Sequence, residues 1–147
     1  MIILHHLKWS LLNWGLRLKF PSVLHISSDE LADWLDDKQR NSPLLLDTRS
    51  PLEYTISHLK NAYLIPSTTQ ELTHLLGLVP STPIVTYCSI GYRSAKVAQQ
   101  LQNLGYEQVF NLEGSLLIWF SENRPVYQEG EPVVHIHPYN RFWSFWL

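Results

Sequence analysis

The chain has 147 residues, of which 45% are hydrophobic and 16% are charged, a composition typical of one globular domain and unlike that of a disordered or fibrous chain. Thirteen acidic and eleven basic side chains give a formal net charge of -2, so no overall basic field favours nucleic acid or anionic lipid. The single cysteine, Cys88, excludes an intrachain disulfide and a cysteine-based zinc site, which favours a reducing compartment and a cytoplasmic location.

The N-terminal segment, residues 1–21, is apolar but is interrupted by charged and histidine side chains. No apolar run in it reaches the length of a membrane span, and it lacks the features of a signal peptide. Apolar side chains recur three and four residues apart and predict an amphipathic helix, with Leu4, Leu7, Leu11, Trp14 and Leu18 on one face. We expect this helix to pack on its own domain; the alternative is peripheral docking on a membrane or a protein partner.

The next segment begins a series of short apolar runs that alternate with helical stretches. Residues 23–26 predict a first strand, and Ser27 with Glu30 has the spacing of a capping box, which predicts a helix at 28–37. Residues 44–46 form a continuous apolar run, which is typical of a parallel strand covered on both faces. The segment therefore predicts the start of an α/β domain.

The rest of the chain continues this alternation. Helices are predicted at 51–57, 71–76, 94–104 and 116–120, and strands at 62–65, 84–87 and 109–110. Strands that alternate with helices in this way predict an α/β fold, with a central parallel five-stranded sheet and helices on both faces. We assign residues 22–128 to this domain.

A C-terminal extension, residues 129–147, follows the domain. Four aromatic side chains lie within residues 141–147, and we expect them either to cover the N-terminal helix or to form a docking surface with it. His135 and His137 would share one face of a strand, a spacing that allows metal binding. Because no third ligand lies nearby in the sequence, we expect no metal there.

Cys88 follows the strand predicted at 84–87 and precedes the helix predicted at 94–104. In a parallel α/β sheet, ligands bind beyond the carboxyl ends of the strands. Gly91 allows the connecting loop to turn its backbone N–H groups inward, where they and the N-terminus of the next helix can hold an anion. We expect a thiol in this position to ionise readily, in preference to the alternative of an apolar cysteine that merely fills the core.

Three segments together resemble the single-domain form of the rhodanese (sulfurtransferase) family. The first is residues 46–66, the second is the loop 88–93, and the third combines Gly105, Tyr106, Val109, residues 112–114 and Trp119. Their order and spacing make the resemblance specific, and it covers the chain from about Leu24 to about Tyr127.

The resemblance implies a rhodanese-type sulfurtransferase of the thiosulfate sulfurtransferase class. Cys88 would accept a sulfane sulfur from thiosulfate or a persulfide donor, form a persulfide, and pass the sulfur to a thiophilic acceptor. The donor and acceptor would be small molecules or proteins, and neither a cofactor nor a metal is implied. The charged sulfur would be held by the backbone amides of the loop, which belong to Ser89, Ile90, Gly91, Tyr92 and Arg93.

Four polar residues upstream of the loop are expected to support it through a buried network; they are Asp47, Arg49, Glu53 and His58. Arg93 could bind an anion or could brace the loop through an ion pair, and the sequence leaves both possibilities open. Two glycines that the family often has are replaced by Ser57 and Ser115, so the local turn geometry also stays open.

Two other functions remain as alternatives. One is a non-catalytic rhodanese-like interaction module, against which the presence of Cys88 argues. The other is a phosphatase or arsenate reductase, but the similar loops of those enzymes are one residue longer than the loop from Cys88 to Arg93. Because Ser89 and Ile90 stand where members specialised for thiosulfate often have a basic residue, we expect thiosulfate to be a poor donor.

Overall fold

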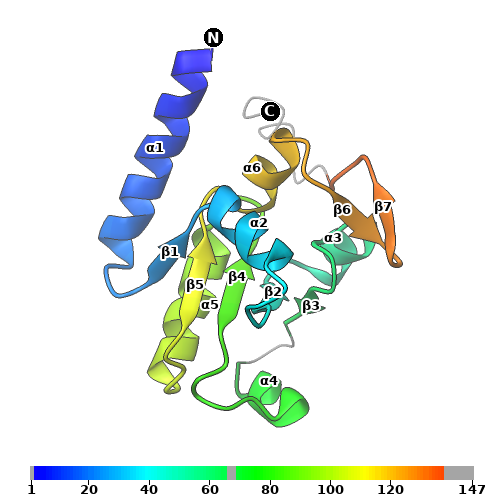
Figure 1. The fold of residues 1–147 in the computed structure, drawn as a ribbon. Coiled ribbons are helices and arrows are strands. Elements are labelled where there is room, and N and C mark those ends of the chain that lie inside the picture. Colours follow the sequence, from blue (N-terminus) through cyan, green and yellow to red (C-terminus); the bar gives the residue numbers. More distant parts are fainter. Residues whose placement is uncertain (1, 66–68, 138–147) are drawn as a thin grey trace.

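The computed structural model describes residues 2–65 and 69–137. Its helices and strands alternate along most of the chain (Figure 1). In chain order they are α1 (Ile2–Lys19), β1 (Leu24–Ile26), α2 (Ser28–Asp36), β2 (Leu44–Asp47), α3 (Pro51–Ile56), β3 (Tyr63–Leu64), α4 (Thr69–Leu76), β4 (Ile84–Tyr87), α5 (Tyr92–Asn103), β5 (Val109–Leu112), α6 (Ser115–Ser121), β6 (Val126–Gln128) and β7 (Glu131–Val133). Every helix and strand expected between residues 22 and 121 is confirmed.

The central sheet has five parallel strands, as predicted, and the structure shows their order to be β1-β5-β4-β2-β3. The middle strand, β4, is buried along its whole length, because the sheet is covered on both faces. This burial explains the unbroken apolar and β-branched sequence of β4. The carboxyl end of β4 therefore opens at the centre of the sheet edge, and Cys88 is the next residue in the chain.

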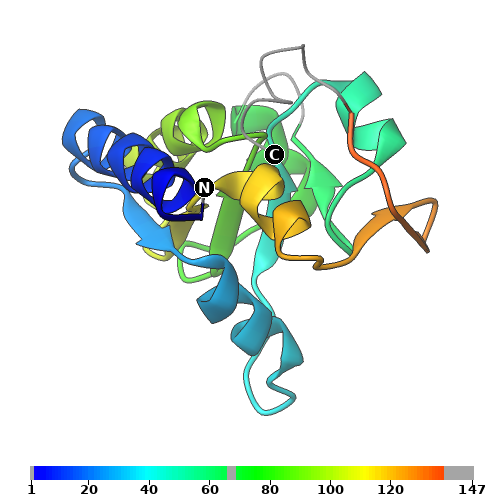
Figure 2. The same cartoon turned by 90° about the horizontal axis from the view of Figure 1, so that it is seen from above.

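Two hydrophobic clusters cover the two faces of the sheet, and Figure 2 shows the helices that belong to each. On one face, α2 and α6 pack their apolar sides against the sheet through Leu31, Trp34, Leu116 and Trp119. On the other face, α1, α4 and α5 pack through side chains that include Leu16, Leu72, Ala98 and Leu101. The helices hold the sheet from both sides, so the loops at its carboxyl edge rest on a rigid scaffold.

The N-terminal helix is confirmed, but a different face of α1 packs on the domain. Its buried contacts come from Trp9 and Leu16, with Leu12 partly buried beside them, and Phe20, the residue after the helix, continues this buried face. The predicted apolar stripe points to solvent, and its five side chains, Leu4, Leu7, Leu11, Trp14 and Leu18, are 55–62% exposed. Helix α1 therefore has two apolar faces, of which the domain buries one.

The segment after α6 differs from the sequence-based expectation. The chain forms an antiparallel hairpin of β6 and β7, which was not predicted, and His135 and His137 lie beyond β7 and not in a strand. Within the described ranges, no group of three potential metal ligands is found. In the same ranges, no helix is both long and apolar enough to span a bilayer. The aromatic segment 141–147 lies outside the described residues.

Candidate active site

The loop after β4 surrounds the sulfur of Cys88. Gly91 has a φ of 115°, a conformation that favours glycine, and this turn directs its backbone N–H to the Sγ atom at 3.0 Å. A side chain at Gly91 would also approach the Leu16 Cδ1 atom to within 3.2 Å. Cys88 is 1% exposed. Its sulfur is therefore buried, as an apolar cysteine would be, but it also accepts a hydrogen bond from the loop.

A second polar group reaches the sulfur from the first turn of α5. The Ser94 Oγ atom lies 3.5 Å from Sγ and 2.6 Å from the Asn111 Oδ1 atom, and the Asn111 side-chain amide donates to the carbonyl oxygen of Gly91 at 3.2 Å. A hydroxyl group has one hydrogen, so Ser94 donates either to Asn111 or to the sulfur. The site can therefore supply a second hydrogen bond when the sulfur becomes negatively charged.

The N-terminus of α6 holds the outer side of the loop. The N–H groups of Leu116 and Leu117 donate to the carbonyl oxygens of Cys88 and Ser89, both at 3.1 Å. The N–H and C=O groups of a trans peptide point in opposite directions. Because α6 binds the carbonyl oxygens of Cys88 and Ser89, the N–H groups of the same two peptides, which belong to Ser89 and Ile90, point away from α6.

Ser115 occupies one of the positions where the family often has glycine, and the structure resolves its turn geometry. Its φ is 48°, and its Oγ atom accepts a hydrogen bond from the backbone N–H of Cys88 at 3.1 Å and donates to Leu112 at 3.1 Å. The serine thus adopts the positive φ expected of glycine. It also contributes a buried contact to Cys88 that glycine could not make.

Glu53 links the upstream segment to the loop. Its carboxylate forms an ion pair with the Arg93 guanidinium at 3.0 Å and accepts a hydrogen bond from the backbone N–H of Ser50 at 2.8 Å, which completes the capping box of α3. Ser89 lies against the same carboxylate at 3.4 Å. Burial favours the neutral carboxyl group, but the hydrogen bonds from Arg93 and Ser50 outweigh it and lower the pKa of Glu53 to about 2. Arg93 is thus braced by an ion pair.

We expect Glu53→Gln to remove a pH-dependent part of the stability. The Glu53 pKa falls from its usual 4.5 to about 2 on folding, so its stabilising effect is complete above pH 4.5 and disappears as the pH falls toward 2. Because Arg93 is 35% exposed and solvent screens the pair, we expect a loss of about 2 kcal/mol at pH 7. Urea unfolding at several pH values would measure it. A difference between wild type and variant that does not shrink below pH 4.5 would contradict this assignment.

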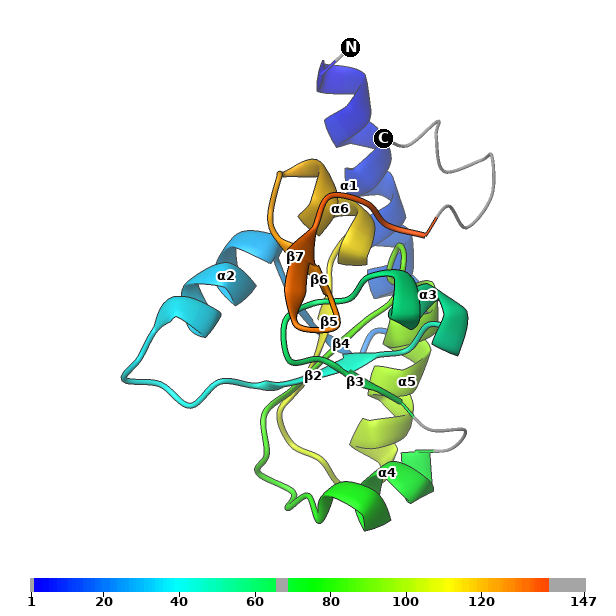
Figure 3. The same cartoon turned by 90° about the vertical axis from the view of Figure 1, so that its right-hand side faces the viewer.

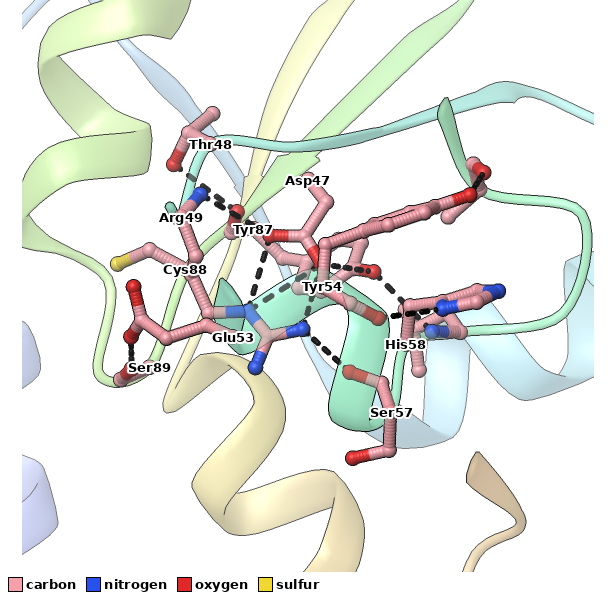
Figure 4. Close-up of polar contacts among 12 residues, drawn as sticks. Asp47, Thr48, Arg49, Glu53, Tyr54, Ser57, His58, Tyr87, Cys88 and Ser89 are labelled. Carbon is pink, nitrogen blue, oxygen red and sulfur yellow. Dashed lines mark hydrogen bonds and ion pairs between the residues drawn. The ribbon is translucent and has the colours of Figure 1, made fainter. Parts of the chain in front are cut away.

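A buried ion pair lies behind the loop (Figure 4). The Arg49 guanidinium contacts the Asp47 carboxylate at 2.6 Å and donates to the carbonyl oxygen of Ser57 at 2.6 Å. The Tyr87 hydroxyl donates to the same carboxylate at 2.8 Å. Burial disfavours the charged form of Arg49, but its hydrogen bonds and ion pair with Asp47 outweigh burial and raise the pKa of the guanidinium. Burial raises the pKa of the Tyr87 hydroxyl well above its usual value. This network ties the ends of β2 and β4 together.

His58 lies on the far side of this network. Its ring stacks on Tyr54 with a centroid distance of 4.0 Å, its Nδ1 atom is 2.8 Å from the Tyr54 carbonyl oxygen, and its backbone pairs with Tyr127. Figure 4 shows His58 and Tyr54 side by side. These contacts place His58 in the packing between α3 and β6.

The side chains of Ile90 and Tyr92 lie at the rim of the loop. Ile90 is partly buried, and the Tyr92 ring packs edge-on against Phe20, the residue after α1, at a centroid distance of 5.8 Å. Sequence reasoning missed three fully buried residues that complete the site, namely Ser94, Asn111 and Ser115. No motif or residue spacing in the sequence points to Ser94 or Asn111. Ser115 could be noted only because it replaces a glycine that the family often has.

A model of the rhodanese-like domain matches residues 27–122. The chain is similar to the thiosulfate sulfurtransferase GlpE of Vibrio cholerae, with 30% identity over 104 residues that cover 70% of this chain and 93% of that protein. It is also similar to the probable adenylyltransferase/sulfurtransferase MoeZ of Mycobacterium tuberculosis, with 32% identity over 101 residues that cover 68% of this chain but only 25% of that protein. Other relatives are named tRNA uridine(34) hydroxylase.

Solved structures have the same fold. A rhodanese-related protein from Thermoplasma volcanium has a TM-score of 0.59 and 26% identity and covers 72% of this chain and 99% of that one. The polysulfide-sulfur transferase homodimer from Wolinella succinogenes has a TM-score of 0.64 and 21% identity, with coverage of 87% and 94%. The family model, the sequence relatives and the solved structures agree, and the chain belongs to the rhodanese-like domain family.

Proposed function

We propose that this protein is a sulfurtransferase that carries a sulfane sulfur on Cys88 as a persulfide. The observation that carries the proposal is the position of the Sγ atom at the carboxyl end of β4, where it accepts the Gly91 N–H at 3.0 Å. Relatives that cover this domain are named sulfurtransferases, which supports the same chemistry here. Phosphoryl chemistry has less support, because the loop is one residue shorter than the phosphatase loops.

The reaction has two displacement steps. The Cys88 thiolate attacks the sulfane sulfur of a donor, a sulfur–sulfur bond forms on Cys88, and the donor's own sulfur–sulfur bond breaks and releases its remaining group with the electron pair. A nucleophilic acceptor then attacks the outer sulfur of the persulfide, and Cys88 leaves as a thiolate. Both species on Cys88 are anions, and hydrogen bonds from Gly91 and Ser94 would stabilise them.

The charge within the loop favours a persulfide donor over thiosulfate. Arg93 is the only charged residue from Cys88 to Arg93, and Glu53 neutralises it. A dianion such as thiosulfate therefore finds no net positive charge in the loop. A small-molecule or protein persulfide fits this site better, because its sulfur–sulfur group carries at most one negative charge where thiosulfate carries two.

Mass spectrometry of the intact protein after exposure to different donors tests the proposal. We expect glutathione persulfide to add one sulfur atom to Cys88 faster than thiosulfate does. Ile90→Lys, which places a cation beside the cysteine, should speed loading by thiosulfate by about fivefold or more while changing loading by the persulfide less. If no donor adds sulfur to Cys88, the protein is a binding module and the proposed function is wrong.

A further inference from the structure

Helix α1 carries an apolar stripe on the side opposite to the domain. Leu4, Leu7, Leu11, Trp14 and Leu18 are each more than half exposed and fall within an arc of about 80° on the helix. The buried residues Trp9, Leu16 and Phe20 lie almost directly opposite. The stripe is about 21 Å long, and a continuous apolar surface of this kind marks an interaction site in a globular protein.

The charges of α1 show what kind of surface fits the stripe. The helix contains three of the eleven Lys and Arg residues of the chain and none of its thirteen Asp and Glu residues. Lys8 and Lys19 lie along one edge of the stripe and Arg17 along the other. Basic side chains on both edges of an apolar face are typical of a helix that lies in the interface of an anionic membrane.

We infer that α1 docks the protein on an anionic lipid surface, with the stripe in the acyl boundary and the flanking cations among the headgroups. Trp14 suits this location, because indole has a large apolar body and one N–H donor. A second copy of the chain is less suitable as the occupant. An antiparallel pair of α1 helices joined through this face would bring the Lys8 and Lys19 edge of one helix toward the same edge of the other, which disfavours such a pair.

The face of α1 that packs on the domain touches the cysteine loop. Leu16 lies beside Gly91, Phe20 contacts the Tyr92 ring, and Lys19 lies 4.9 Å above the same ring. Arg17 pairs with Glu113, immediately before the turn that leads into α6. The N-terminal part of α1 extends past the carboxyl edge of the sheet (Figures 1 and 3). Docking through the stripe would therefore hold the cysteine loop close to the membrane surface.

Sedimentation of the full chain with vesicles tests this inference. We expect binding to vesicles that contain phosphatidylglycerol, weaker binding to pure phosphatidylcholine vesicles, and a loss of affinity as salt is added. The combined variant Leu7→Gln, Leu11→Gln and Trp14→Gln should bind about a hundredfold more weakly or worse. These three side chains make up the middle of the exposed stripe, so circular dichroism should show an unchanged fold.

A matched control changes three exposed apolar residues elsewhere. Val79, Leu104 and Val134 are 43–91% exposed, and their replacement by Gln should leave vesicle binding unchanged. Two separate single variants, Lys8→Gln and Lys19→Gln, should each weaken binding by about fivefold. If the stripe variant does not fold, these two charge variants and the salt dependence of binding decide the question in its place.

Three results of the vesicle experiments would overturn the inference. They are no binding of the wild type to anionic vesicles, equal binding to neutral vesicles, and a stripe variant that folds and binds like the wild type. Sedimentation velocity without lipid should show a monomer; a dimer that the stripe variant dissociates would assign this surface to a second copy and contradict the lipid proposal. None of these readouts depends on sulfur transfer, so this inference and the proposed function can fail separately.

Discussion

Cys88→Ser is expected to reduce sulfur transfer by at least about a thousandfold, because no other cysteine exists in the chain and a serine hydroxyl stays protonated at neutral pH. The fold should be preserved. The serine oxygen can still accept the hydrogen bond from Gly91, so we expect a stability change of about 1 kcal/mol or less. Transfer from a glutathione persulfide donor to a thiol acceptor, followed alongside thermal unfolding, measures both effects.

Cys88→Ala gives a second comparison. This variant also removes the acceptor for the Gly91 N–H, and it should be as inactive as Cys88→Ser but less stable, because a buried donor loses its partner. Measurable transfer by either folded variant would show that another group carries the sulfur. In that case the assignment of Cys88 as the nucleophile would be wrong, even if mass spectrometry shows an added sulfur atom on the wild-type protein.

Arg49→Met is expected to have the largest effect on stability, a loss of about 3–5 kcal/mol. The Asp47 carboxylate is fully buried, and its ion-pair partner is Arg49. Removal of that partner leaves a buried negative charge, and the Ser57 carbonyl oxygen also loses a donor. Urea unfolding at neutral pH measures the change in the free energy of unfolding.

A double variant and an exposed pair provide the controls. Asp47→Asn combined with Arg49→Met removes both charges and should recover a large part of the lost stability, because the isolated charge causes most of the loss. Arg124→Met breaks ion pairs with Asp29 and Glu122, whose side chains are 83% and 39% exposed, and should cost about 1 kcal/mol or less. If Arg49→Met is no more destabilising than Arg124→Met, the buried network does not support the site.

The position of the reactive group could be predicted from the sequence because local patterns specify it. The apolar run of β4, the glycine that turns the loop and the periodic helix of α5 are all continuous in the chain. Their order places Cys88 at the carboxyl edge of the sheet without reference to any distant residue. The capping box of Ser27 and Glu30 was predictable for the same reason, since both partners lie within one helical turn.

The polar surroundings of the sulfur could not be predicted in this way. Ser94, Asn111 and Ser115 come from three different elements and meet at the loop only when β5 and α6 pack beside it. The two possible roles of Arg93 likewise stayed open until Glu53, 40 positions away, was found against it. Contacts of this kind depend on strand order and helix packing, which no local pattern encodes.

Periodicity and turn residues act over short distances, so the α/β fold, the helices and strands between residues 22 and 121 and the place of the only cysteine could all be predicted from the amino-acid sequence. The choice of the buried face of α1, in contrast, depends on how the helix packs in the folded chain. Two apolar faces satisfy the helical period equally well, and the one that includes Leu16 fits against α5 and the cysteine loop. The other face, which the periodicity marks more clearly, is the one left in solvent.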